Sequence, residues 1–423
     1  MVAPAMMAGM STPRRPMPIG STRWILTLAS MTALIALSID MSLPAQPTFS
    51  ERFGVSSETA SLTLATFMIG FAIAQLIVGY LSDAWGRRRV IMGGLALFTV
   101  SAIACAFATS IEMLLVFRTL QGIGGSAAPV CARAMVRDTQ PAKDAARILS
   151  TMLATLAVAP MIAPSIGGVM LSLFGWRSIF ATLALSGLVL MILAHRTLEE
   201  TLPPERRLQL SPLGLLRGFR TFFGTPGTKL PILISCTSFI GQFAYVAVSP
   251  FIYLDGYGVS ETAFGVYFAL TAIALMLGSI VGGRMLRGGR TLGQMIVIGT
   301  SLLVVGSIAV AIATRPDDAG IAAFLIPMII YFFGCGIAQP SATALALEPV
   351  PQIAGTASAA IGFLTMTSGA LAGYLTTKIG GSDPHAFSRV VAVVGILAAA
   401  IAVVTAIRRR RRLLNRPSAP TLG

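Results

Sequence analysis

Long apolar runs recur from one end of the chain to the other, and each is long enough to cross a lipid bilayer. A membrane-spanning α-helix needs about 20 mostly apolar residues, and helices are favoured there because all their backbone hydrogen bonds are internal. Twelve such runs lie at 24–43, 60–81, 90–108, 112–136, 145–174, 178–195, 230–254, 263–285, 292–313, 321–347, 353–377 and 387–407. We therefore expect an all-α membrane protein with twelve transmembrane helices.

The composition excludes an ordinary soluble protein. The chain is 55% hydrophobic and 11% charged, whereas a soluble domain carries roughly 25% charged residues. A net charge of +15 would by itself suggest a nucleic-acid partner. The Lys and Arg residues lie in short loops between apolar runs, however, and not on one basic face. We expect contact with membrane lipid and no nucleic-acid partner.

The positions of the basic residues predict how the helices are oriented. With the N-terminus in the cytoplasm, most of the 31 Lys and Arg residues fall in cytoplasmic segments, as the positive-inside rule requires. An odd number of spans would place one basic end on the wrong side. Both termini are therefore expected to be cytoplasmic.

The segment 196–229 divides the chain near its middle, with six runs on either side. Two sets of six spans are typical of transporters built from repeats, so we expect two pseudo-symmetric six-helix bundles. The predicted parts are a disordered cytoplasmic tail at 1–22, an N-terminal bundle at 23–195, a cytoplasmic linker at 196–229, a C-terminal bundle at 230–407 and a basic cytoplasmic tail at 408–423.

A direct repeat favours duplication of one ancestral half. FGVSSET at 53–59 precedes the second run, and YGVSET at 257–262 precedes the eighth. Beyond a one-residue gap the offset between the halves is constant, and Gly86 then aligns with Gly289. Asp83 aligns with Leu286, so the two copies are expected to differ in function.

The loop after the second run reads GYLSDAWGRRR at 79–89. It matches the pattern G-x-L-x-D-x-x-G-R-R, the signature loop of the major facilitator superfamily, and the chain is identified by this resemblance as a member. A basic loop that only obeyed the positive-inside rule would need the arginines, but not the glycines and the aspartate at this spacing. The resemblance implies a transporter that works by alternating access.

We interpret this loop as a conformational latch. Gly79 would let two helices approach closely. Asp83 would face the positive N-terminus of another helix, which the resemblance identifies as the eleventh span. Arg87 would pair with an acid at the inner end of the fourth span. We expect these contacts only while the cytoplasmic side is closed, so that they favour one conformer. The predicted latch comprises Gly79, Asp83, Gly86, Arg87, Arg88 and Asp138.

Shorter motifs resemble the Bcr/CflA (bicyclomycin and chloramphenicol resistance) subfamily of drug:proton antiporters. They lie at 38–47, 118–125, 159–168, 175–180, 198–203 and 249–251. This chain departs from the subfamily at Ser42, where a tyrosine is usual. The resemblance implies proton-coupled efflux of small, mostly apolar drugs or toxic compounds across the bacterial inner membrane. A carrier of one specific metabolite is the alternative.

Two charged residues lie inside apolar runs and are candidates for proton coupling. A charge near the middle of a bilayer costs roughly 2.5–3.5 kcal/mol on insertion scales, so Asp40 and Arg118 are expected to face a cavity or to pair. Removal from water favours the neutral form of a carboxyl group, which makes Asp40 the candidate proton carrier. A static Asp40–Arg118 pair, or an Asp40 that reaches the outer interface, is the structural alternative.

The fifth run contains the predicted kink residues Pro160, Pro164, Gly167 and Gly168. Proline removes a backbone donor and bends a helix, while glycine permits close packing. A kink without a role in transport is the alternative. The substrate cavity is expected to include Met41, Gln121, Phe239, Phe243 and Tyr245, although ordinary helix packing explains each of them equally well.

Other functional classes find little support. The four cysteines and two histidines form no cluster, so we expect no metal site, and no catalytic constellation indicates an enzyme. The chain lacks the G-x-x-x-x-G-K-S/T loop that an ATP-driven pump would need. We expect the proton gradient to be the energy source, with no cofactor. Because one chain supplies both bundles, we expect it to function as a monomer.

Overall fold

The computed structural model describes residues 19–207, 212–316, 319–380 and 383–414. Most of the predicted N-terminal tail and the end of the predicted C-terminal tail lie outside these residues. In the described residues, α1 begins at Thr22 and α14 ends at Leu414. The last helix therefore extends beyond residue 407, where we expected the basic tail to begin.

The described residues contain helices and no strands. The long helices are α1 (Thr22–Asp40), α3 (Ser57–Trp85), α4 (Arg87–Ala106), α5 (Ile111–Thr139), α6 (Ala142–Phe174), α7 (Trp176–Thr197), α9 (Lys229–Pro250), α10 (Glu261–Arg287), α11 (Leu292–Ala313), α12 (Ile321–Leu347), α13 (Ala354–Gly380) and α14 (Pro384–Leu414). The shorter ones are η1 (Leu43–Ala45), α2 (Gln46–Phe53), η2 (Pro204–Arg206), α8 (Pro212–Gly224), η3 (Phe251–Gly256) and η4 (Pro351–Ile353).

Eleven helical segments in the described part of the chain are long and apolar enough to cross a membrane. The twelfth long helix, α5, is not among them. It carries Arg118 and Gln121, and both side chains are fully buried. Because α5 packs against α3 and α4, it buries these polar groups against protein. The all-helical membrane fold is thus confirmed, with one helix more polar than we expected.

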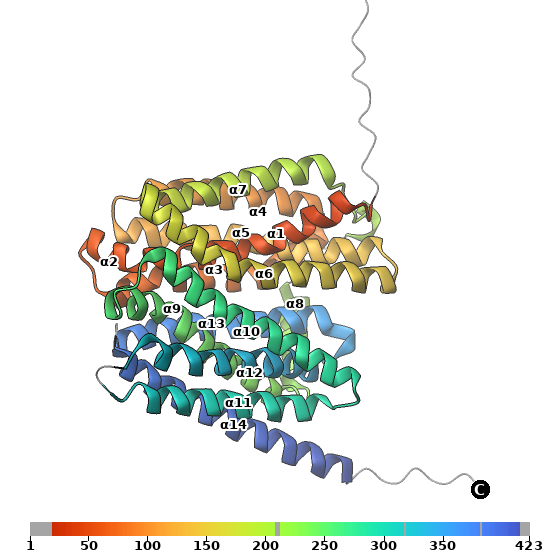
Figure 1. Ribbon diagram of the computed structural model, residues 1–423. Helices are drawn as coiled ribbons and strands as arrows, with labels where there is room; N and C mark the ends of the chain where they lie inside the picture. Colours follow the sequence, from red (N-terminus) through yellow and green to blue (C-terminus); the bar gives the residue numbers. More distant parts are fainter. Residues whose placement is uncertain (1–18, 208–211, 317–318, 381–382, 415–423) are drawn as a thin grey trace, which may run out of the picture.

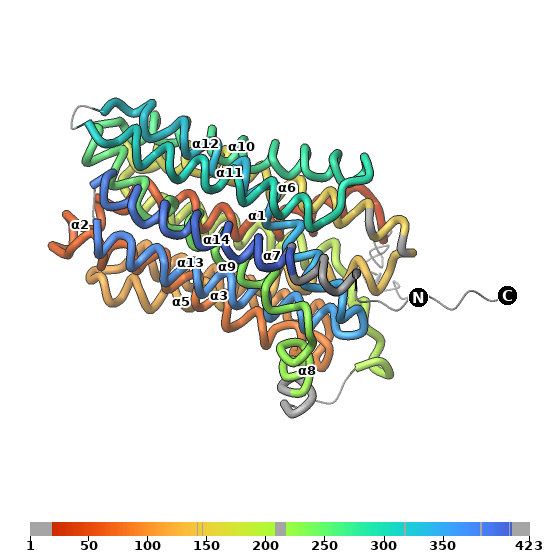
Figure 2. The backbone as a smooth tube through the Cα atoms, turned by 90° about the horizontal axis from the view of Figure 1, so that it is seen from below, coloured from red at the N-terminus to blue at the C-terminus, as the bar shows by residue number. Residues whose placement is uncertain are grey.

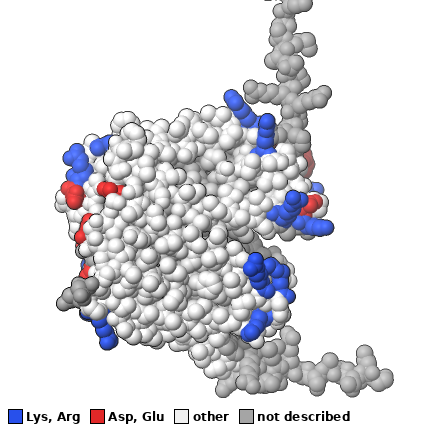
Figure 3. All heavy atoms as spheres, in the orientation of Figure 1, with Lys and Arg blue, Asp and Glu red and all other residues white. Residues whose placement is uncertain are grey.

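The helices form two bundles that lie side by side (Figure 1). Helices α1 to α7 make one bundle and α9 to α14 the other, and the tube view shows their axes running in a common direction (Figure 2). The bundles meet where α3 packs against α13 and α6 against α10. Charged side chains gather at the two ends of the molecule, and an uncharged band lies between them (Figure 3). This band is the surface that suits lipid.

The repeated segments have the same local structure in both bundles. Gly54 and Gly258 both have φ of +63°, a left-handed conformation that glycine adopts without strain. Ser56 and Ser260 follow as N-caps of α3 and α10, each accepting a hydrogen bond from a backbone N–H three residues on. A serine cap satisfies one of the free amides at the start of a helix.

The two ends of the molecule differ in how closely the bundles approach. We call the end with Arg87 and the linker the basic end. There a notch separates the bundles (Figure 3). At the opposite end, a Cβ on Gly168 of α6 would lie 2.3 Å from the backbone oxygen of Glu261 on α10. The structure is therefore closed at that end and open at the basic end.

The predicted linker contains a helix that we did not expect. This helix, α8, packs against α13. Its Phe222 is fully buried, in a cluster that includes Val350 and Ile361. Part of the linker thus belongs to the apolar core at the basic end of the C-terminal bundle.

Candidate functional site

The signature loop is a turn of one residue between two long helices. Helix α3 ends at Trp85 and α4 begins at Arg87. Gly86 between them has φ of +96°, which disfavours any residue with a side chain. Its N–H donates to the backbone oxygen of Ser82. The chain therefore reverses direction sharply and places Arg87 at the start of α4.

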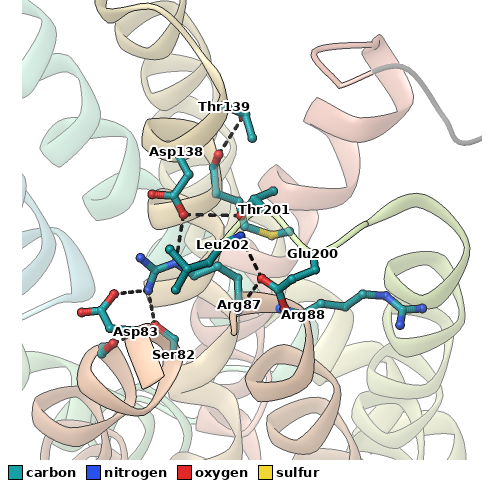
Figure 4. Close-up of polar contacts among 11 residues, drawn as sticks. Ser82, Asp83, Arg87, Arg88, Asp138, Thr139, Glu200, Thr201 and Leu202 are labelled. Carbon is teal, nitrogen blue, oxygen red and sulfur yellow. Dashed lines mark hydrogen bonds and ion pairs between the residues drawn. The ribbon is translucent and has the colours of Figure 1, made fainter. Parts of the chain in front are cut away.

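Arg87 connects the ends of three helices. Its Nε donates to Oδ2 of Asp138 at 3.0 Å, and its Nη1 donates to the hydroxyl of Ser82 at 2.6 Å and to the carboxylate of Asp83 (Figure 4). The predicted contact between Arg87 and Asp138 is present. It joins two helices of the same bundle and exists while the basic end is open, so it does not depend on closure as we expected.

Two of the predicted latch contacts are absent from the described structure. Asp83 binds Arg87, and no hydrogen bond joins it to the start of α13. A Cβ on Gly79 would lie 3.8 Å from Val130, an ordinary van der Waals distance. The prediction that Gly79 permits a close helix approach is wrong for this conformation. The bundles are apart at this end, which removes the helix start that Asp83 was expected to meet.

Arg118 is fully buried and is stabilised mainly by neutral acceptors. Its Nε donates to the backbone oxygen of Thr63 at 3.0 Å. Its Nη1 donates to the backbone oxygen of Ser38 at 3.2 Å and to Oε1 of Gln121 at 2.8 Å. Its Nη2 donates to Ser42, and the guanidinium lies 4.5 Å from the centre of the Phe67 ring. The carbonyl dipoles and the negative face of the Phe67 ring both stabilise the positive charge of the guanidinium.

Asp40 is the last residue of α1 and is 6% exposed. Within the described residues, no ion pair or hydrogen bond reaches its carboxylate. The alternative of a static Asp40–Arg118 pair is therefore wrong for this structure. A buried carboxylate without a partner is unfavourable as an anion. A proton would remove that charge, which is the chemistry that a proton carrier needs.

The glycines of the fifth run lie where α1, α6 and α10 meet. A Cβ on Gly167 would lie 2.2 Å from the backbone oxygen of Met41, next to Asp40, and one on Gly168 would meet Glu261. Helix α6 continues without interruption through Pro160 and Pro164. The predicted close packing is present, and it closes the end of the molecule opposite the basic end.

Four of the five predicted cavity residues form two pairs. Met41 follows Asp40, and Gln121 accepts a hydrogen bond from Arg118. Nε2 of Gln121 is buried without a hydrogen-bond partner among the described residues. Phe239 and Phe243 stack at 4.7 Å between ring centroids and pack against Gly369 of α13.

Tyr245 does not lie at the boundary between the bundles. It is fully buried in an aromatic cluster of its own bundle, with Phe268, Phe324, Phe332 and Phe387 as neighbours. Its hydroxyl donates to that of Tyr253 at 3.5 Å. The prediction of a cavity contact for Tyr245 is therefore wrong, because the side chain completes the bundle core.

One residue at the signature loop was not foreseen from the sequence. Glu200 lies in the stretch that follows α7, and its carboxylate accepts hydrogen bonds from the backbone N–H groups of Arg87 and Arg88. Arg88 also donates to the backbone oxygens of Leu198 and His195. The motif at 198–203 marked this stretch as unusual, but nothing in the sequence linked it to the loop.

Comparison with known proteins gives consistent results. The sequence profile of the Major Facilitator Superfamily matches residues 28–373. The chain is 35% identical to YdgK of Bacillus subtilis, named an uncharacterized MFS-type transporter, over 84% of this chain and 89% of the relative. It is 29% identical to a bicyclomycin resistance protein homolog of Haemophilus influenzae, with the same coverage, and to a chloramphenicol resistance protein of Pseudomonas aeruginosa, over 79% of each chain.

Solved structures support the fold. A crystal structure of the peptide transporter POT in complex with sulfate superposes with a TM-score of 0.76 at 14% identity, over 94% of this chain and 96% of that one. A D-xylose-proton symporter gives 0.72 at 17% identity, over 90% and 97%. The two-bundle architecture is thus shared with solved transporters.

Proposed function

Because this chain belongs to the Major Facilitator Superfamily, we propose that it is a drug:proton antiporter of the Bcr/CflA type. It is a multi-pass membrane transporter and not an enzyme. In our proposal it exports small, mostly apolar drugs or toxic compounds across the bacterial inner membrane. The relatives named for resistance to bicyclomycin and chloramphenicol support this substrate class, and so do the sequence motifs that resemble the subfamily.

The observation that carries the proposal is the environment of Asp40. Its carboxyl group is buried and has no partner among the described residues. The next residue, Met41, packs against α6 at Gly167, and the neighbouring Gly168 packs against α10 of the other bundle. When the bundles move relative to each other, the surroundings of Asp40 must change. Access of protons to this carboxyl is therefore coupled to the conformation.

Exchange follows if a proton and a substrate compete for this site. A bound proton neutralises the carboxyl, and an arriving substrate with cationic or polar character favours its ionised form. Each elementary charge moved across 100 mV contributes about 2.3 kcal/mol, so a proton gradient can drive export without a cofactor. Arg118 holds the neighbouring turn of α1 through the backbone oxygen of Ser38 and so fixes the position of the carboxyl.

The remaining parts of the proposal concern orientation and assembly. The basic end lies in the cytoplasm, with both termini, since the arginine-rich loops gather there and the positive-inside rule places them inside. In the described structure the transporter then faces the cytoplasm. A single chain provides both bundles, and we propose that the monomer is the functional unit.

The test is substrate efflux by Asp40→Asn in proteoliposomes with an imposed pH gradient, with ethidium as the probe. We expect the variant to bind ethidium, but its rate of proton-driven efflux should fall at least tenfold. Asp144→Asn is the matched control, because Asp144 is exposed at the inner start of α6. Full proton-driven efflux by Asp40→Asn would contradict the proposal.

A carrier of one specific metabolite is distinguished by direction and range. Energised cells that express an exporter should accumulate less of a fluorescent cation than de-energised cells. The opposite result, or transport of a single metabolite only, would favour the alternative.

A further inference from the structure

The stretch that follows α7 lies across the start of α4 (Figure 4). We call residues 198–202 the strap. Leu198 and Leu202 at its ends are 2% and 8% exposed, so both are anchored in the core. Glu199 is exposed, whereas Glu200 is half-buried. The two leucines thus hold the strap so that Glu200 reaches the signature loop.

The carboxylate of Glu200 caps α4 from a distant part of the chain. Oε1 accepts from the N–H of Arg87 at 2.9 Å, and Oε2 accepts from the N–H of Arg88 at 3.2 Å. Helix α4 has no cap of its own, because Gly86 occupies the N-cap position and has no side chain. The free amides and the helix dipole both favour an anion at this point.

Further hydrogen bonds join the strap and the end of α7 to the signature loop and to Asp138. Arg88 donates to the backbone oxygen of Leu198 at 2.8 Å and to that of His195 at 3.1 Å. Thr201 donates to Oδ2 of Asp138 at 3.4 Å, the same oxygen that Arg87 contacts. The strap therefore touches both partners of the Arg87–Asp138 pair.

Glu200 adds a second reason for glycine at position 86, beside its positive φ. A Cβ on Gly86 would lie 2.3 Å from Oε2 of Glu200. The counterpart in the second repeat, Gly289, has a similar φ of +90°, yet no atom of the described residues lies within 4 Å of its Cβ position. Both glycines have positive φ, but only Gly86 makes room for a carboxylate.

We propose that Glu200 is a positioning residue of the transport cycle, which fixes the start of α4 so that Arg87 stays aligned with Asp138 and Asp83. The strap is the first part of the linker between the bundles, so the linker is joined directly to the signature loop. The C-terminal repeat has no such arrangement at Gly289. The effect on the conformational cycle rests on the proposed function of the loop, whereas the capping itself does not.

The capping is tested by hydrogen exchange of the full-length protein in nanodiscs. Glu200→Ala should speed exchange of the amides of Arg87 and Arg88 at least tenfold. Glu199→Ala, which removes an exposed carboxylate one residue away, should leave them unchanged. Equal exchange in the two variants would overturn the proposal.

The steric part is tested by comparing two glycines. Gly86→Ala and Gly289→Ala both place a side chain at a residue with positive φ, but only the former collides with Glu200. We expect Gly86→Ala to lower the Tm further, and Glu200→Ala to recover part of that loss in the double variant. No recovery in the double variant would show that Glu200 does not contribute to the need for glycine. This comparison also remains informative if Glu200→Ala alone folds poorly.

The positioning role requires a readout that a purely structural contact would not change. Spin labels on Arg147→Cys of α6 and Arg284→Cys of α10 report the width of the notch at the basic end, in a background without the native cysteines. Because Glu200 contacts the loop in the form that is open at the basic end, Glu200→Ala should shift this distance distribution away from that form, and Glu199→Ala should not. An unchanged distribution would refute the role. The distance measurement needs no substrate. Failure of the wild type to transport ethidium would therefore contradict the proposed function but not the positioning role of Glu200.

Discussion

At the scale of single residues, the chemistry of the site depends on which buried charges have partners. Arg118 has backbone oxygens, Gln121 and Ser42 around it. Asp40 has no such partner among the described residues. The cation is therefore held in place, whereas a proton could neutralise the carboxyl. This difference supports a structural role for Arg118, and in our proposal Asp40 has the coupling role.

Replacement of Arg118 should destabilise the protein more than it changes substrate binding. Hydrogen bonds to a charged group contribute roughly 1.5–3 kcal/mol each, and Arg118→Ala leaves the backbone oxygens of Thr63 and Ser38 without this donor. We expect a clear drop in the Tm in nanodiscs. Arg118→Lys should recover little of it, because lysine lacks the planar fork of donors. Arg52→Ala, on an exposed residue, is the control and should leave the Tm unchanged. A similar Tm for Arg118→Ala and wild type would contradict this assignment.

The sequence predicted some of these contacts and not others, for a physical reason. Arg87 and Asp138 were paired correctly because a motif fixed one residue and helix length placed the other. Asp40 and Arg118 have compatible depths, but depth does not determine the direction of a side chain. The bond between Glu200 and Arg87 spans 113 positions, and no local pattern encodes contact at that separation.

At the scale of helices, packing explains where polarity and distortion occur. The polar side chains of α5 are buried between other helices, so this span does not need the apolarity of a lipid-facing one. Pro250 ends α9, and a turn of π-helix, η3, completes the span. Apolar runs predicted these helices and their approximate limits. They could not reveal α8, whose apolar face is short and is buried only when it meets α13.

Substitution of Gly168 should change the balance between conformers. An alanine Cβ would collide with backbone atoms of Glu261, so the bundles would have to separate at the end opposite the basic end. Spin labels on Phe174→Cys and Val266→Cys should report a longer distance in Gly168→Ala. Gly93→Ala is the control, because nothing lies within 4 Å of that Cβ position and alanine favours a helix. An unchanged distance in Gly168→Ala would show that this contact does not hold the end closed.

At the scale of the whole molecule, the two related bundles differ in the charged groups that they carry. Asp40, Arg118 and the signature loop all belong to the N-terminal bundle. The C-terminal bundle has Leu286 at the position equivalent to Asp83, and no atom of the described residues lies within 4 Å of the Cβ position of Gly289. The sequence predicted two bundles from the even number of apolar runs and from the repeat. It could not predict which end is open, because the conformers share one sequence and differ only in how the bundles pack.

The central claim is that Asp40 exchanges a proton for the substrate, and substrate-induced proton release tests it most directly. Ethidium is added to purified, detergent-solubilised protein in weakly buffered solution near neutral pH, and the released protons are measured with a pH indicator. The account predicts release by the wild type and none by Asp40→Asn, although the variant still binds ethidium. Equal proton release by both proteins would contradict it.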